Sequence, residues 1–233
     1  MSLQTLQIDK HLQENYFKHV DTSDLSQSNE TDIEQKLKTR SLTALAINML
    51  TDSTPEEACA AVVDGYNDNG IDGIFFSETD GTLHIIQSKY HSDGNGSIEL
   101  GDLHKFLSGV SDLIQGNFEK FNRKVSKRNQ EILDILMNAQ NNFNLVLSYS
   151  GKDRISSHCN AAIEDFLDKN NEIGERFYFT PLDIKEIYSF ISSGAGYSPI
   201  NLDVAIHNWS HIEKPIKSVY GQIAGSDLAD WYS

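Results

Sequence analysis

The chain has 233 residues and a formal net charge of −15 at pH 7, because aspartate and glutamate outnumber lysine and arginine by 34 to 19. That charge opposes non-specific adhesion to nucleic acid, no stretch approaches the ~18 consecutive apolar residues of a membrane helix, and the N-terminus lacks the apolar segment of a signal peptide. The two cysteines, Cys59 and Cys159, match no zinc spacing, so we expect a cytoplasmic protein with free thiols, no membrane span and no structural metal.

The first part of the chain is expected to be helical. Residues 1–30 are polar and predict an N-terminal extension whose one helix-like piece is LQENYFKHV. From Thr31 onward, apolar residues recur with a helical period behind a capping residue, which predicts a helix over residues 31–52. The next segment, STPEEACAAVVDG, has a capping residue and then Pro55 in the first turn, so we expect a second, short helix that ends near Gly65.

Residues 71–90 predict a β-hairpin. IFF and LHII are short apolar runs of strand type, and ETDG between them has the composition of a turn. If residues 78–81 form that turn, Ser77 pairs with Thr82. The same antiparallel register then extends to the start of the first strand and the end of the second.

Three polar side chains lie within these otherwise apolar strands. The register places Asp72 opposite Gln87, with their Cβ atoms about 5 Å apart. Since side chains alternate along a strand, Gln87 and Lys89 share one face, while Ile86 and Ser88 share the other. We therefore expect Asp72, Gln87 and Lys89 to converge.

The rest of the chain alternates helices and strands. The predicted elements are a helix broken around Gly116, a strand, a helix, a strand and a helix, which cover in that order residues 100–140, 143–151, 156–170, 175–183 and 183–191. One more strand, NLDVAIHN, and a terminal helical piece are expected near the end. Alternation of this kind after a hairpin predicts an α/β fold in which a mixed sheet is flanked by helices.

An acid, an amide oxygen and a lysine on adjacent strands suit metal-assisted phosphodiester cleavage. Asp72 would bind Mg²⁺, a hard cation that prefers oxygen ligands, with the side-chain oxygen of Gln87 and the main-chain carbonyl of Ser88 as further ligands. Lys89 would orient or help to deprotonate the attacking water and offset charge on the phosphate. The alternative is a hairpin with a solvated end, in which Asp72 caps the preceding turn and Lys89 is exposed.

The same residues resemble a known signature. NDNGIDGIFF followed by LHIIQSKY is similar to the Asp...Gln-x-Lys motif of the PD-(D/E)XK nuclease superfamily, in the version with Gln that marks Mrr-like restriction enzymes. VVDGYNDNGIDGIFF, IIQSKY and VYGQIAGSDLADWY together resemble the N-terminal region of the abortive infection phage resistance (AIPR) family, over roughly residues 40–233.

This resemblance implies a restriction-endonuclease-like domain over residues 31–192, behind the N-terminal extension 1–30. It also implies a C-terminal extension, 193–233, that leads toward a downstream domain of a longer polypeptide, while a homo-oligomer is left open. The activity implied is a nuclease that depends on Mg²⁺ or Mn²⁺, acts on DNA and serves in defence against phage. Residues from about 200 onward would then expose apolar surface to a partner. The side chains expected there are Trp209, Trp231 and Tyr232.

Carried over by motif position, Asp72 matches the metal-binding acid, Gln87 the position held by Glu or Gln, and Lys89 the catalytic lysine. The departure from the family pattern is in the first helix, where SLTALAINML has no glutamate for the metal. The acids that could replace it are more readily explained as solvated helix acids. These are Glu34, Glu56 and Glu57.

Four other polar residues near the motif have ordinary explanations. Asp64 and Asp68 could support the metal ligands, but a turn acid is the better interpretation of either one alone. We interpret His84 as a partly buried or edge histidine and His91 as a surface loop residue.

A basic run between residues 118 and 128 could contact phosphates, since a nuclease needs some positive surface even on an acidic chain. Its five cations are Lys120, Arg123, Lys124, Lys127 and Arg128. The alternative is a solvated helix face.

The rival function for the whole chain is a non-catalytic module that binds nucleic acid or protein and has an incomplete metal site. The missing helix glutamate and the charge of −15 favour that rival.

Overall fold

The computed structural model describes residues 2–26, 29–193, 206–212 and 218–224. The chain divides into two compact units, Met1–Ala195 and Gly196–Ser233. Residues 1–30, expected to form an extension, belong to the first unit, which also contains every residue of the candidate site.

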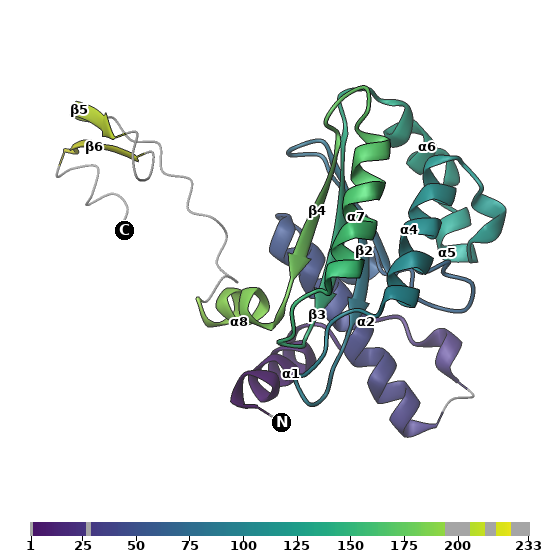
Figure 1. The fold of residues 1–233 in the computed structure, drawn as a ribbon. Coiled ribbons are helices and arrows are strands. Elements are labelled where there is room, and N and C mark those ends of the chain that lie inside the picture. The colour runs from purple at the N-terminus through teal and green to yellow at the C-terminus, as the bar shows by residue number, and fades with distance from the viewer. Residues whose placement is uncertain (1, 27–28, 194–205, 213–217, 225–233) are drawn as a thin grey trace. The chain divides into compact units, whose positions relative to one another are not determined.

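The first unit is built on one four-stranded sheet (Figure 1). Its strands are β1 (Gly73–Ser77), β2 (Thr82–Lys89), β3 (Asn142–Tyr149) and β4 (Phe177–Leu182), and they lie in that order across the sheet. The β1 and β2 strands are antiparallel, whereas β2, β3 and β4 run parallel to one another. The predicted α/β fold with a mixed sheet is confirmed.

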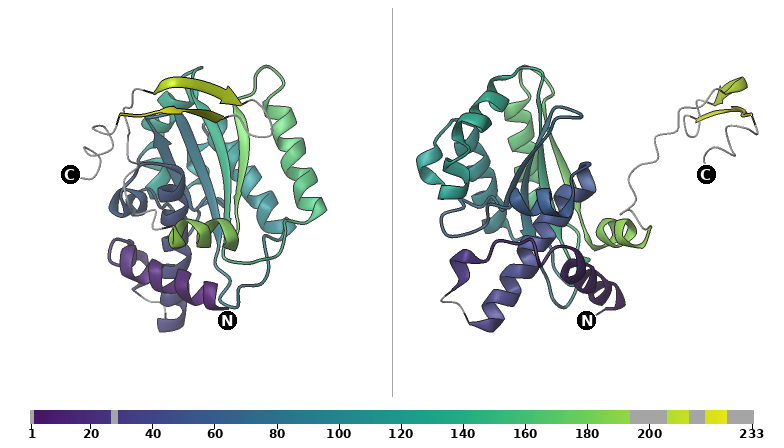
Figure 2. Two further views of the ribbon diagram at one scale, coloured as in Figure 1. Left: turned by 90° about the vertical axis from the view of Figure 1, so that its left-hand side faces the viewer. Right: turned by 180° about the vertical axis from the view of Figure 1, so that it is seen from behind.

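Helices cover both faces of this sheet, as Figures 1 and 2 show. One face packs against α4 (Leu100–Ile114), α5 (Arg123–Ser126), α6 (Asn129–Met137) and α7 (Ser157–Asn170). The other packs against α1 (Leu3–Asn15), α2 (Glu30–Leu50), α3 (Pro55–Ala60) and α8 (Ile184–Ser192). Two 3₁₀ turns, η1 (Ser23–Leu25) and η2 (Phe118–Lys120), lie in the connections.

The alternation of side chains in β2 explains the two cores. Leu83 and Ile85 are fully buried among the helices of the first face, and Ile86 is fully buried among those of the second. Successive side chains of a strand point to opposite faces, so each core takes every second residue. With both faces buried, β2 and β3 are apolar along most of their length.

Helix α2 begins where the sequence predicts and runs through the core. Asn29 caps it by accepting a hydrogen bond from the main-chain N–H of Asp32, and acids in the first turn favour the positive end of the helix dipole. Residues 40–47 are all buried. Its middle therefore packs against the sheet on one side and against other helices on the other.

The short helix α3 ends earlier than expected. Thr54 and Glu57 form a capping box, with Pro55 at the first position, as predicted. The helix nevertheless stops at Ala60, and residues 61–72 form a loop that returns beside the start of β1 through a bridge between Val62 and Gly73. This loop brings additional acids to the end of the hairpin.

The N-terminal helix begins earlier than expected, and the predicted break in the helix at 100–140 is confirmed. The N-terminal helix runs from Leu3, not from residue 12, because Thr5, Ile8 and Leu12 form a buried stripe at helical spacing. The helix at 100–140 does break near Gly116, which has a positive φ of 75°.

In the second unit, β5 (His207–Ile212) pairs with β6 (Ser218–Gln222), and Trp209 is exposed. Most of the strand expected at 201–208, the terminal helical piece, Trp231 and Tyr232 lie outside the described residues.

In the part of the chain that the structure describes, no helix is both long enough and apolar enough to span a membrane.

Candidate metal centre

The hairpin has the predicted register. Ser77 pairs with Thr82 and Gly73 with Ile86, so one further step places Asp72 opposite Gln87, and residues 78–81 form the loop. The predicted alignment along the hairpin is therefore confirmed.

The predicted faces of β2 are confirmed by its contacts. Gln87 Nε2 donates to the main-chain oxygen of Asp102 in α4 at 3.4 Å, and Lys89 Nζ forms an ion pair with the carboxylate of the same Asp102 at 2.8 Å. The hydroxyl of Ser88 instead accepts a hydrogen bond from Thr43 in α2, on the opposite face. Gln87 and Lys89 thus point to the same side of the sheet.

Asp72 is fixed by main-chain hydrogen bonds on every side. Its carboxylate accepts a hydrogen bond of 2.7 Å from the N–H of Ser88, and its own N–H donates to the carbonyl of Ile86. Its carbonyl accepts from the N–H groups of Val63 and Asp64, which ties the returning loop to the hairpin. The carboxylate therefore has little freedom to move.

Burial first, and then the nearby Asp64 and Asp68 carboxylates, raise the pKa of Asp72 to about 7. The Ser88 N–H and Lys89 act in the opposite direction but do not offset the burial. A cation bound beside such an acid would stabilise its ionised form, because the positive charge offsets the cost of burying the carboxylate.

Three carboxylates meet at this point. One oxygen from each of Asp64, Asp68 and Asp72 lies within 4.8 Å of the other two. All three belong to the loop that precedes β1, and none to the first helix. This cluster can hold a metal ion, because hard divalent cations take several carboxylate oxygens.

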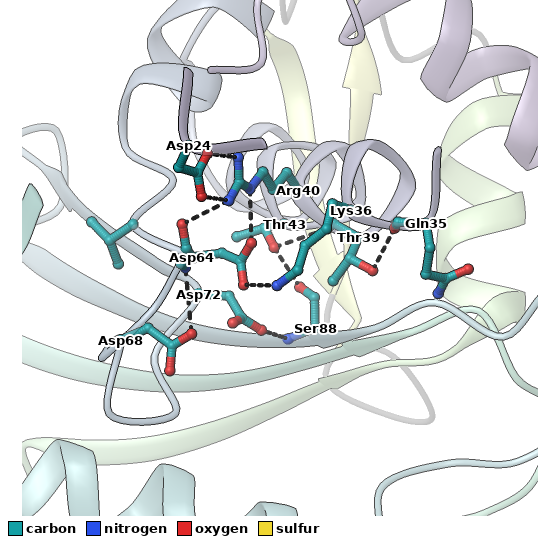
Figure 3. Close-up of polar contacts among 12 residues, drawn as sticks. Asp24, Gln35, Lys36, Thr39, Arg40, Thr43, Asp64, Asp68, Asp72 and Ser88 are labelled. Carbon is teal, nitrogen blue, oxygen red and sulfur yellow. Dashed lines mark hydrogen bonds and ion pairs between the residues drawn. The ribbon is translucent and has the colours of Figure 1, made fainter. Parts of the chain in front are cut away.

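Helix α2 contributes cations to the site, which hold Asp64 in place (Figure 3). Arg40 is fully buried, and its Nε donates to the Asp64 carboxylate at 2.7 Å. Its other two nitrogens form a bidentate pair with Asp24, at 2.8 and 2.6 Å. Lys36 Nζ lies 3.4 Å from the second oxygen of Asp64. A buried, bidentate arginine gives Asp64 a fixed orientation.

Asp68 combines a turn role with its place in the cluster. Its carboxylate accepts hydrogen bonds from the N–H of Gly70 at 2.8 Å and of Gly65 at 3.4 Å, so it is a turn acid, as interpreted from the sequence. Lys105 Nζ of α4 lies 3.1 Å from the same carboxylate. The turn geometry therefore also sets the direction in which Asp68 faces the cluster.

A cavity of about 510 Å³ opens at the cluster. Its lining includes the three aspartates, Gln87, Lys89, Lys36 and Lys105. The side-chain oxygen of Gln87 is buried and accepts no hydrogen bond from the residues that the structure describes. Such an oxygen fits a metal or a metal-bound water, so the residues present suit a hard divalent cation. For Ser88 the structure gives the N–H contact to Asp72, and its carbonyl as a ligand stays a prediction.

The helix glutamates considered from the sequence do not belong to this cavity. Glu34 forms an ion pair of 2.7 Å with Lys38, and Glu57 is occupied in the capping box of α3. Neither lines the cavity, and nor does Glu56. These contacts agree with their interpretation as solvated helix acids; the acids beside Asp72 are Asp64 and Asp68, and Asp32 of α2 also lines the cavity.

The basic run is less free than its charge suggests. Lys120 pairs with Asp112 at 2.5 Å, Lys124 with Asp21 at 3.2 Å, and Arg128 with Glu131 at 2.7 Å. Arg123 and Lys127 are exposed. Three of the five cations are thus paired with acids of this chain, and phosphate binding by this run stays a prediction.

Neither His84 nor His91 lines the cavity at the cluster. His84 is buried beside Asn144, and burial lowers its pKa. The ring of His91 lies 2.9 Å from the carbonyl of Ser97, so it supports the loop after β2.

Comparison of the chain with protein-family models, with curated proteins and with solved structures returned no match.

Proposed function

We propose that the chain is a metal-dependent nuclease that hydrolyses phosphodiester bonds in DNA, with Mg²⁺ or Mn²⁺ as cofactor. The observation that carries the proposal is the convergence of Asp64, Asp68 and Asp72 with Gln87 and Lys89 in one cavity. The AIPR resemblance adds the biological setting, which is defence against phage.

The aspartates would hold the cation, with the free oxygen of Gln87 as a neutral ligand. A divalent cation bound there polarises the phosphoryl oxygen and increases the acidity of a bound water. Mg²⁺ and Mn²⁺ fit the donor set because all four side-chain donors are oxygens.

The protein's own groups orient this site. The Ser88 N–H fixes one oxygen of Asp72, and Arg40 fixes one oxygen of Asp64. Lys89 stands at the open side of the cavity, about one third exposed, and its partner Asp102 is also partly exposed. An ion pair this open to solvent is weak, so a phosphate can take over the Lys89 ammonium and have its developing charge offset there.

The objection raised by the overall −15 is met at the cavity only with a metal bound, because the lysines there are paired with aspartates and a divalent cation would add the positive charge that attracts a phosphate. Arg40, Lys36, Lys105 and Lys89 all lie around the cluster. Phosphate attraction depends on the field at the cavity more than on the charge of the whole chain. An acidic protein can therefore bind nucleic acid at this one place.

The same ion pairs favour a second candidate function, a non-catalytic binding module. Without a metal, each of the lysines 36, 89 and 105 already neutralises an aspartate. A site in which Asp64 and Asp68 already have basic partners has less need of a cation to be stable. In that case the fold would bind nucleic acid or protein without cleaving it.

Cleavage assays with matched variants separate the two functions. Plasmid DNA and a folded RNA are incubated with the wild-type chain and Mg²⁺ or Mn²⁺, beside Asp72→Asn, Lys89→Ala and the surface control Lys152→Ala. We expect DNA cleavage by the wild type and the control, and loss of cleavage in the other two. Absence of cleavage by the wild type with both metals would support the binding module. Plaque counts in cells that express the same four proteins test the role in defence.

A further inference from the structure

A second cavity, of about 570 Å³, adjoins the candidate metal centre. The two cavities share three lining residues, Lys36, Asp68 and Lys105. The second one also contains Lys120 and Tyr66. A chain of phosphates that enters the candidate metal centre would therefore come close to the lysines of this second cavity.

Tyr66 is presented to solvent by a loop that is itself firmly held. The residue is 90% exposed, which is high for a large aromatic residue. The loop around it is closed by the hydrogen bonds of Asp68 to Gly65 and Gly70, and Asn69 donates to Asp112 of α4. Asn69 adopts a positive φ of 55°. The ring is thus displayed on a rigid turn.

The lysines around this ring can change partners. Lys36, Lys105 and Lys120 pair with aspartates, but their side chains are 44%, 58% and 51% exposed. The partner aspartates are only 7%, 13% and 13% exposed and lose their cation when a lysine turns to a phosphate, so the exchange needs another cation at those carboxylates. A cation at the candidate metal centre would favour this exchange, since it competes with Lys36 and Lys105 for the oxygens of Asp64 and Asp68.

We propose that this second cavity binds a nucleotide of single-stranded nucleic acid, with its base stacked on Tyr66 and its phosphates on Lys36, Lys105 and Lys120. The inference rests on the proposed function, and it specifies the form of the substrate that reaches the metal centre. An aromatic ring beside exposed cations is the usual platform for unpaired bases.

The exposed ring selects a single strand over a duplex. The bases of a duplex are stacked on one another, so their faces are closed to a side chain unless the helix is opened. A duplex would meet Tyr66 only with its backbone. The preference should therefore disappear when the ring is removed and persist when only the hydroxyl is removed.

Binding is measured by fluorescence anisotropy with a labelled oligothymidine and with a hairpin duplex, in Mg²⁺. All proteins carry Lys89→Ala so that cleavage does not interfere. Tyr66→Ala should weaken single-strand binding by about 5- to 150-fold, the loss expected for one aromatic–base stack, whereas Tyr66→Phe should bind as before. The control is Tyr178→Ala, a tyrosine of β4 that lines neither cavity. Lys105→Ala should reduce the salt dependence of single-strand binding by the contribution of about one phosphate.

Several results would overturn the inference. These are unchanged single-strand affinity in Tyr66→Ala, an equal loss in Tyr66→Phe, an equal loss for the duplex, or no binding of the oligonucleotide at all. Its failure is distinct from failure of the proposed function. If the wild type cleaves DNA and Tyr66→Ala cleaves a single strand equally well, only the inference fails. If Tyr66 governs binding but no metal supports cleavage, only the proposed hydrolysis fails.

Discussion

Replacing Asp72 by asparagine should stabilise the metal-free protein at neutral and alkaline pH. Burial raises the pKa of this acid from the ordinary 3.8 to about 7. An acid with a higher pKa in the folded state binds its proton more tightly when folded, so its contribution to stability is lost as the pH rises from about 4 to about 7. The difference of about three pKa units, at ~1.4 kcal/mol each, sets a limit of about 4 kcal/mol.

Asparagine fits the position because its carbonyl oxygen can still accept the hydrogen bond from the Ser88 N–H. Its amide group would face the Asp64 and Asp68 carboxylates, which lie within 4.8 Å of the present Asp72 carboxylate. The neutral side chain removes both the buried charge and the repulsion. The gain should therefore be absent near pH 4, grow as the pH rises toward about 7, and be complete above it.

Urea denaturation in EDTA, at several pH values between about 4.5 and 8, measures the free energy of unfolding. The difference between Asp72→Asn and the wild type cancels the titration of the other acids, and Asp165→Asn, an exposed aspartate of α7, is the control. Added Mg²⁺ should stabilise the wild type and not the variant. A variant that is less stable than the wild type at pH 8 would refute the reasoning, because it would mean that the nearby cations already stabilise the Asp72 carboxylate.

Three further predictions concern the groups around Asp72. Arg40→Met should destabilise the fold by about 3–5 kcal/mol, because it leaves the buried Asp64 carboxylate with only the partly exposed Lys36 at 3.4 Å and removes the two hydrogen bonds to Asp24; thermal or urea unfolding measures the loss, and partial recovery in Arg40→Met with Asp64→Asn would identify the Asp64 charge as a cause. Lys36→Met and Lys105→Met should tighten Mn²⁺ binding in calorimetry without nucleic acid, since each removes a competing cation, and yet weaken oligonucleotide binding; looser Mn²⁺ binding would contradict the proposed exchange of partners. Metal affinity should rise about tenfold from pH 6 to pH 8, because Asp72 must lose its proton to bind, and a flat pH profile would exclude Asp72 as a ligand.

The hairpin could be predicted in detail from the sequence because its determinants are local. Turn residues fix the loop at 78–81, the register follows from the loop, and the period of two then gives the faces of Gln87 and Lys89. Asp72 lies in the same continuous segment. No long-range contact was needed for that part of the site.

The other acids of the candidate site could not be assigned in this way. Asp64 and Asp68 each look like a turn acid, and only the return of the loop beside β1 brings them to Asp72. Arg40 lies at the end of the charged first half of α2, close behind Lys36 and Lys38, so the residue pattern does not distinguish it from the exposed cations of that half. The identity of its acidic partner depended on packing between segments far apart in the chain.

The bidentate pair between Arg40 and Asp24 has a consequence for how fragments of this protein are designed. The polar residues before α2 look dispensable, and a domain boundary near residue 30 would be a natural choice for expression. Such a fragment would remove Asp24 and also the α1 side chains that pack over the middle of α2. If such a fragment were inactive, the cause could be the loss of the contacts that hold α2 and Asp64 at the candidate metal centre. Its inactivity would not show whether the intact protein is an enzyme.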